Sequence, residues 1–165
     1  MMKNNSFKKG NYNRILEIVA LIGLILSLTP LLFFNKIDKN VSIPIHYNLY
    51  GEIDDWGSRS FLWIIPIIAI AFYIILSLGE KFHKKLNYPI KITKNNAEEV
   101  YRIAIQLIRT LKALFLVILA YINNISLAYA YGYNCYFNKF IMPFFIIILL
   151  GVVILYYIKI IKYKE

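Results

Sequence analysis

The chain has 165 residues, of which 59% are hydrophobic and 17% charged, and its net charge is +10. Soluble domains hold about 45–50% apolar residues. Here the excess is gathered in long blocks, which is typical of a membrane protein. The basic charge lies between these blocks, so it indicates a lipid surface rather than nucleic acid as the partner. The single cysteine, Cys135, excludes an internal disulfide and a cysteine metal cluster.

Four apolar blocks are long enough to cross a bilayer, because a helix needs about 20 residues to span a core about 30 Å thick. They cover residues 15–34, 61–78, 113–131 and 140–158. Glu17 is the one Asp, Glu, Lys or Arg within them, and it lies at an edge where it can reach water. Open strands would leave backbone groups unpaired in lipid. We therefore predict an all-α integral membrane protein with four transmembrane helices.

The distribution of Lys and Arg predicts the orientation of these helices. Fifteen of the 19 basic residues lie in the tail 1–14, the segment 81–112 and the tail 159–165, and the other two loops hold four. We therefore expect both termini and segment 81–112 to be cytoplasmic, with loop 35–60 outside. By this division, residues 15–80 form a first helical hairpin with its outer loop, and residues 113–158 form a second.

The outer loop is dense in polar residues. Residues 42–47 alternate enough to form a short strand or an extended arm. Turn formers follow: Asn48, Gly51, Asp54 and Gly57. We expect a compact, hairpin-like cap on the outer membrane surface. Arg59 is a candidate partner for Asp54 or Asp55, and Trp56 can rest on lipid or on the bundle.

An enzymatic site is a weaker interpretation of the same loop. One imidazole and several carboxylates could surround a divalent metal ion: His46, Glu52, Asp54 and Asp55. One histidine with carboxylates is a poor zinc ligand set, and no nucleophile, base and orienting group stand out. We expect these side chains to tie the loop together. We predict no catalytic residue, no cofactor and no metal, and a protein that is not an enzyme.

Segment 81–112 predicts an amphipathic cytoplasmic helix. Pro89 interrupts any helix that runs on from the second block, and Asn96 and Glu99 have the spacing of a capping box. Apolar residues then recur along one helical face, with charged residues, Arg109 and Lys112 among them, mostly opposite. We expect this helix to lie along the inner surface or pack on the bundle and then to continue into the third block.

The third block carries polar residues near its centre: Asn123, Asn124 and Ser126. We interpret them as interhelical hydrogen-bonding residues. Ala120, Asn124 and Ala128 recur every fourth residue, a spacing that suits close helix contact. A lining for a polar pathway is the alternative, although no charged residue accompanies them, which argues against a proton relay.

The most specific motif reads Pro, any residue, His, aromatic, Asn, two residues, Gly, two residues, Asp, two residues, Gly-Ser-Arg. It comprises Pro44, His46, Tyr47, Asn48, Gly51, Asp54, Gly57, Ser58 and Arg59, with Trp56 inside it. With this motif, residues 15–80 closely resemble the amino-terminal domain of unknown function of SdpI-like bacterial membrane proteins. The resemblance does not extend to the two later blocks. It implies a multi-pass protein of the bacterial plasma membrane, and the family's name implies immunity against a secreted membrane-active factor.

The leading functional hypothesis is a non-enzymatic immunity, protection or binding protein. Its outer loop would meet a secreted membrane-active peptide or an envelope protein, while lipid surrounds the helices. Two alternatives stay open: an accessory subunit of a membrane complex, with a homo-oligomer among the arrangements considered, and a small transporter.

Overall fold

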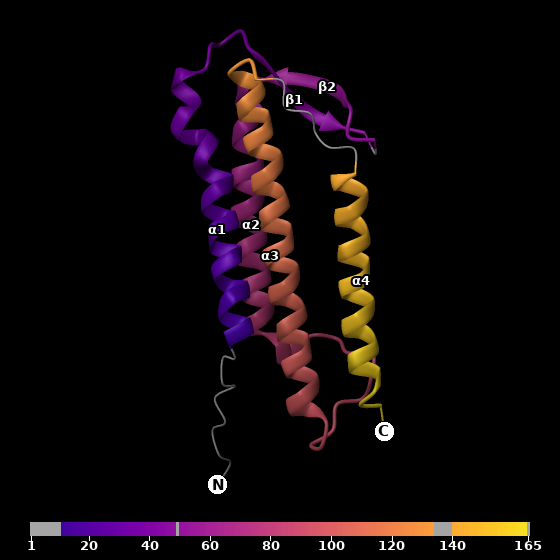
Figure 1. Ribbon diagram of the computed structural model, residues 1–165. Helices are drawn as coiled ribbons and strands as arrows, with labels where there is room; N and C mark the ends of the chain where they lie inside the picture. The colour runs from indigo at the N-terminus through magenta and orange to yellow at the C-terminus, as the bar shows by residue number, and fades with distance from the viewer. Residues whose placement is uncertain (1–10, 49, 134–139, 165) are drawn as a thin grey trace.

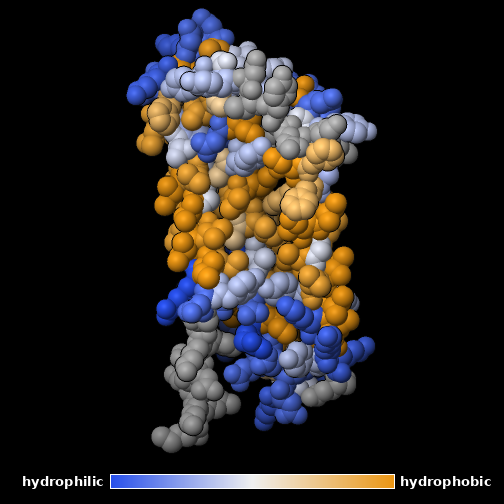
Figure 2. All heavy atoms as spheres, in the orientation of Figure 1, coloured by the Kyte–Doolittle hydropathy of each residue, from blue (hydrophilic) through white to orange (hydrophobic). Residues whose placement is uncertain are grey.

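The computed structural model describes residues 11–48, 50–133 and 140–164. Four long helices run side by side along the molecule: α1 (Asn11–Phe33), α2 (Ile64–Lys81), α3 (Ala97–Ala130) and α4 (Ile141–Ile161) (Figure 1). Each is long and apolar enough to cross a membrane, which confirms the four predicted spans. Figure 2 shows a broad hydrophobic belt between two polar ends. The chain is therefore a multi-pass membrane protein. Cys135 lies outside the described residues.

A two-stranded sheet makes the fold mostly helical rather than all-α. Strands β1 (Ser42–Tyr47) and β2 (Ile53–Ser58) pair antiparallel. They cover one end of the bundle, which we call the hairpin end (Figure 1). The start of α1 and the end of α4 lie at the opposite end, which we call the termini end. The strands form because they lie beyond the long helices, where they can pair with each other.

The hairpin end has a small apolar core that joins the sheet to the helices. Ile37, Ile43 and Leu62 are buried together, and Leu127 of α3 packs against them. Short 3₁₀ turns, Phe34–Lys36 and Arg59–Trp63, lead from α1 into this region and from the sheet into α2. The sheet is thus packed on the bundle.

Helix α3 is the centre of the bundle, since it contacts α1, α2 and α4. Its first turns pack on α4, where Val100 and Ile103 are buried with Tyr156 and Ile160. The segment predicted as an amphipathic helix is therefore the start of one continuous 34-residue helix. It packs on the bundle, which was one of the two arrangements considered, and does not lie along the membrane surface.

Helices α1 and α3 approach each other closely in the middle of the belt. A Cβ atom on Gly23 would lie 2.9 Å from the backbone carbonyl carbon of Leu116, so only glycine fits there. Ala20, Ala69 and Leu116 are fully buried at the same level. This apolar layer separates the polar residues of the two ends.

Candidate functional site

The inner strand of the hairpin is bonded to helix α3. Ser126 Oγ donates to the carbonyl oxygen of Pro44 at 3.0 Å, and both residues are buried. Proline has no N–H to give to the sheet, but its carbonyl still needs a donor when buried. The serine of the third span therefore fixes the height of β1 on the bundle.

Arg59 joins the two ends of the outer segment. Its Nη1 donates to the carbonyl oxygens of Phe34, at 3.1 Å, and Ile37, and its guanidinium lies 4.6 Å from the ring centroid of Phe34. The predicted pairing with Asp54 or Asp55 is therefore wrong. The carbonyl of Phe34 also accepts from the N–H of Ile37, at 3.3 Å. Because Ile37 is buried, the two carbonyls beside Arg59 lie closer to the core than the exposed carboxylates.

The turn between the strands is organised by Asn48. Its Oδ1 accepts from the backbone N–H groups of Tyr50 and Glu52, at 2.9 and 3.0 Å, and its Nδ2 donates to Glu52 Oε2 at 2.9 Å. Gly51 has φ +76°, a backbone conformation that a side chain disfavours. The Asn and Gly of the motif thus shape this turn.

The outer strand presents acidic and aromatic side chains. Asp54, Asp55 and Trp56 of β2 are exposed, Trp56 by 51%. Asp54 Oδ1 lies 2.6 Å from His46 Nδ1, and Trp56 packs edge-on against Tyr129 of α3. Among the described residues β2 pairs with β1 alone, so its other edge has no strand partner there.

The rest of the motif packs within the same sheet. Tyr47 lies opposite Ile53, and Ser58 lies opposite Ser42. A Cβ atom on Gly57 would lie 2.8 Å from Ile45 Cγ2. The structure therefore brings all ten motif residues into one hairpin and the turns that border it.

The hairpin's ionisable residues do not form a metal cluster. Within the described ranges, no three His, Cys, Asp or Glu side chains are grouped so that they could hold a metal ion. Glu52 accepts from Asn48 and Asp55 Oδ1 accepts from the N–H of Trp56 at 2.8 Å. These bonds organise the loop, and only His46 and Asp54 pair directly.

The two asparagines of α3 bond to the backbone of α1. Asn123 Nδ2 donates to Ser27 O at 2.9 Å, and Asn124 Nδ2 donates to Leu26 O at 2.8 Å. The second bond has a clear cause, because Pro30 in α1 lacks the N–H that would otherwise serve Leu26. Thr29 Oγ1 lies 2.7 Å from the same carbonyl oxygen and 2.8 Å from Asn124 Oδ1, and its single hydrogen can be donated to either. These groups satisfy a carbonyl within the belt, as the absence of water there requires.

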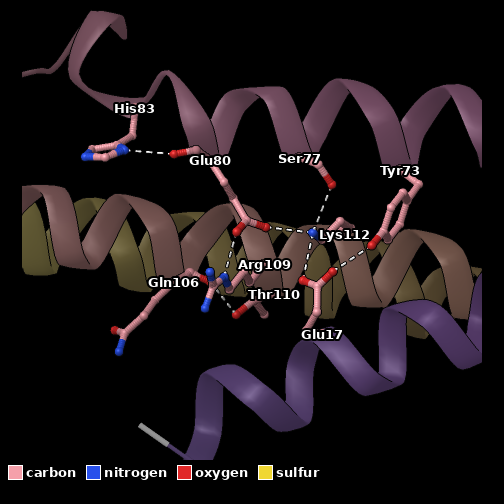
Figure 3. A network of polar contacts seen from close by, with 9 residues as sticks. All are labelled: Glu17, Tyr73, Ser77, Glu80, His83, Gln106, Arg109, Thr110 and Lys112. Atoms are coloured by element: carbon pink, nitrogen blue, oxygen red, sulfur yellow. Dashed lines mark hydrogen bonds and ion pairs between the residues drawn. The ribbon is translucent and has the colours of Figure 1, made fainter. Parts of the chain in front are cut away.

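A second polar site, which we call the ion-pair cluster, lies within the helices near the termini end (Figure 3). Lys112 Nζ lies 2.8 Å from Glu17 Oε2 and 2.7 Å from Glu80 Oε1, with Ser77 Oγ at 3.2 Å. The Lys112 side chain is 2% exposed. Removal of an ion from water costs several kcal/mol, so this buried lysine depends on both carboxylates.

The cluster joins α1, α2 and α3. Arg109 Nε donates to the other oxygen of Glu80 at 2.8 Å, and Tyr73 OH donates to Glu17 at 2.9 Å. The Tyr73 ring centroid also lies 4.9 Å from Lys112 Nζ. Each carboxylate is thus held by two donors from other helices.

The sequence pattern did not predict this cluster. Lys112 and Arg109 were expected on the polar face of an amphipathic helix, and Glu17 was expected to reach water. Both basic residues in fact point into the bundle toward carboxylates. One signal was available: the predicted topology brings Glu17, the end of the second block and the start of the third block to the same membrane face, with acids on two helices and bases on the third.

These features define a multi-pass membrane protein with a hairpin cap at one end and an ion-pair cluster near the other. A family model described as a domain of unknown function, DUF1648, matches residues 40–70, which include the hairpin and the start of α2. No curated protein and no solved structure matches the chain. The SdpI-like assignment stays a prediction.

Proposed function

We propose that this protein is a non-enzymatic binding or protection protein of the bacterial plasma membrane, with its hairpin end outside the cell. The outward orientation is supported by the bias of Lys and Arg toward the tails and the segment between α2 and α3. The SdpI-like motif supports the bacterial membrane and the protective role.

The single observation that carries the proposal is the chemistry of β2. Its exposed side chains include two carboxylates, Asp54, which lies beside His46, and Asp55, together with the half-exposed ring of Trp56. The nearby Arg59 is directed at backbone carbonyls, so it does not neutralise these acids. Such a surface suits a cationic peptide with apolar side chains, which is the usual character of membrane-active peptides.

The way in which the hairpin is attached to the helices also favours binding. Ser126 and Arg59 fix the inner strand and the base of the sheet, and the edge of β2 that has no strand partner among the described residues suits an extended segment added as a strand. A rigid support lowers the ordering cost of binding. A conduit is less favoured, because the buried layer of Ala20, Ala69 and Leu116 separates the polar residues of the two ends.

The proposal is tested by survival of bacteria that express the protein and meet cationic membrane-active peptides. The double variant Asp54→Asn, Asp55→Asn removes two charges, while its amides can still accept from His46 and from the Trp56 N–H. We expect the natural protein to raise survival and the double variant to lose most of that gain.

The matched control is Asp38→Asn, which removes an exposed acid from the same loop outside the sheet. It should protect as well as the natural protein does. Unchanged survival with the natural protein, shown to be present in the membrane, would contradict the protective role. Equal loss in the control would mean that the overall charge, and not the β2 surface, matters.

A further inference from the structure

A polar hollow of about 630 Å³ opens between α1, α2 and α3 beside the ion-pair cluster. Ligand pockets in proteins commonly have volumes of this order. Its lining includes three cations, Arg14, Arg109 and Lys112, but only two carboxylates, Glu17 and Glu80. The lining therefore has one positive charge in excess.

The excess charge belongs to Arg14. Lys112 and Arg109 are paired with the two carboxylates, whereas Arg14 is exposed and forms no ion pair within the described part of the chain. The neighbouring Asn13 also has a polar atom without a hydrogen-bond partner in this part of the chain. Its Oδ1 is buried and receives no hydrogen bond there. Together they call for an anion that also carries a hydrogen-bond donor.

The hollow opens near the start of α1, where a bilayer around the apolar belt would place its headgroups. Arg14 stands one turn into α1, and Ile18, Leu21 and Ile25 follow it at the spacing of one helical face. All three are exposed, by 55%, 40% and 61%. Acyl chains could therefore run along this face while a headgroup occupies the hollow.

We propose that the hollow binds an anionic phospholipid whose headgroup carries hydroxyl groups, with phosphatidylglycerol as the type. The phosphate meets Arg14 and balances the excess charge, and a headgroup hydroxyl donates to Asn13 Oδ1. Phosphatidylethanolamine has no net charge to balance Arg14, and phosphatidylcholine also lacks the donor. Soluble glycerol phosphate shares the recognised chemistry but lacks the chains that would contact Ile18 and Leu21.

The test is the lipid retained by the full-length protein after exchange into equal amounts of phosphatidylglycerol, phosphatidylethanolamine and phosphatidylcholine, measured by native mass spectrometry. We expect phosphatidylglycerol to be enriched. Arg14→Gln should lower its retention about tenfold, since it removes a charge-assisted contact. Asn13→Ala should lower it by a smaller factor, and it tests the same site if the arginine variant does not fold.

The matched control is Lys162→Gln, which removes an exposed cation at the same end of the bundle. It should retain as much phosphatidylglycerol as the natural protein. Equal losses in Lys162→Gln and Arg14→Gln would overturn the site in favour of general attraction to a basic surface. Unchanged retention in both Arg14→Gln and Asn13→Ala would also overturn it. Displacement of the lipid by equimolar soluble glycerol phosphate would overturn the lipid as the ligand.

Discussion

At the hairpin end, the polar groups that reach the bundle are bonded to backbone carbonyls, whereas near the termini end charged side chains bind one another. Ser126, Asn123, Asn124 and Arg59 each donate to a carbonyl oxygen. Lys112 and Arg109 instead pair with carboxylates. The first arrangement supplies hydrogen-bond donors to backbone carbonyl groups that regular helical hydrogen bonding does not fully satisfy. The second joins three helices through ion pairs, and each charge in these pairs needs its partner.

This difference predicts different costs of mutation. The loss of a carbonyl's donor leaves a neutral group unsatisfied, which costs about 1–3 kcal/mol. The loss of one member of a buried ion pair leaves a charge without its partner, which costs about 3–5 kcal/mol. Variants at the two ends can therefore test whether these costs differ.

The largest effect is expected for Lys112→Met. Glu17 and Glu80 would lose their shared cation, so the free energy of unfolding in detergent should fall by about 3–5 kcal/mol. Adding Glu17→Gln should recover part of this loss, because Glu80 keeps its pair with Arg109. Lys84→Met, at an exposed lysine, is the control. Equal stability of Lys112→Met and this control would show that the cluster does not hold the helices.

A smaller effect is expected for Arg59→Lys. Lysine keeps the charge but lacks the planar guanidinium that lies over the Phe34 ring while its Nη1 reaches two carbonyls, so we expect a loss of about 1.5–3 kcal/mol. Faster hydrogen exchange in residues 53–58 should accompany it. Lys39→Met, at an exposed lysine in the same loop, should change neither. If exchange stays slow in Arg59→Lys, the guanidinium does not secure the hairpin.

The bond from Asn124 to Leu26 can be isolated by a double-mutant cycle with Pro30. Asn124→Leu should lower the unfolding free energy by about 0.6–1.7 kcal/mol, the range for hydrogen bonds between membrane helices. Pro30→Ala restores an N–H for Leu26, so Asn124→Leu should cost less in that background. Strict additivity of the two changes would refute the link between the proline and the asparagine.

The smallest effect is expected for the neutral phenol of Tyr88, which lies at the termini end. Burial, helped by the nearby Tyr101, raises the pKa of Tyr88 to about 12, and its hydroxyl donates to His83 O at 2.8 Å. The folded state therefore favours the neutral phenol. Its contribution to stability is complete below the ordinary pKa of about 10 and is lost as the pH rises toward 12. An ultraviolet difference titration against Tyr88→Phe should show this late midpoint, and a midpoint near 10 would contradict it.

The sequence could predict those parts of the fold that depend on residues close together in the chain. The four apolar blocks follow from composition, and the hairpin follows from a motif in which alternation and turn formers are contiguous. The partner of Arg59 could not be predicted, because sequence does not show that the carbonyls of Phe34 and Ile37, just beyond α1, meet the guanidinium. Lys112 was assigned to solvent for a related reason. A hydropathy pattern treats each lysine alone, whereas its burial depends on Glu17 and Glu80, which meet it only after three helices have assembled.

The proposed role of the hairpin depends most on which end of the bundle faces outward. A membrane-impermeant maleimide can test this on intact cells, with Cys135→Ser as the background and single cysteines at exposed positions of the two ends. We predict that Asn40→Cys is labelled on intact cells and that Lys164→Cys is labelled only after permeabilisation. The reverse pattern would put the acidic strand in the cytoplasm and contradict the proposed role of the hairpin.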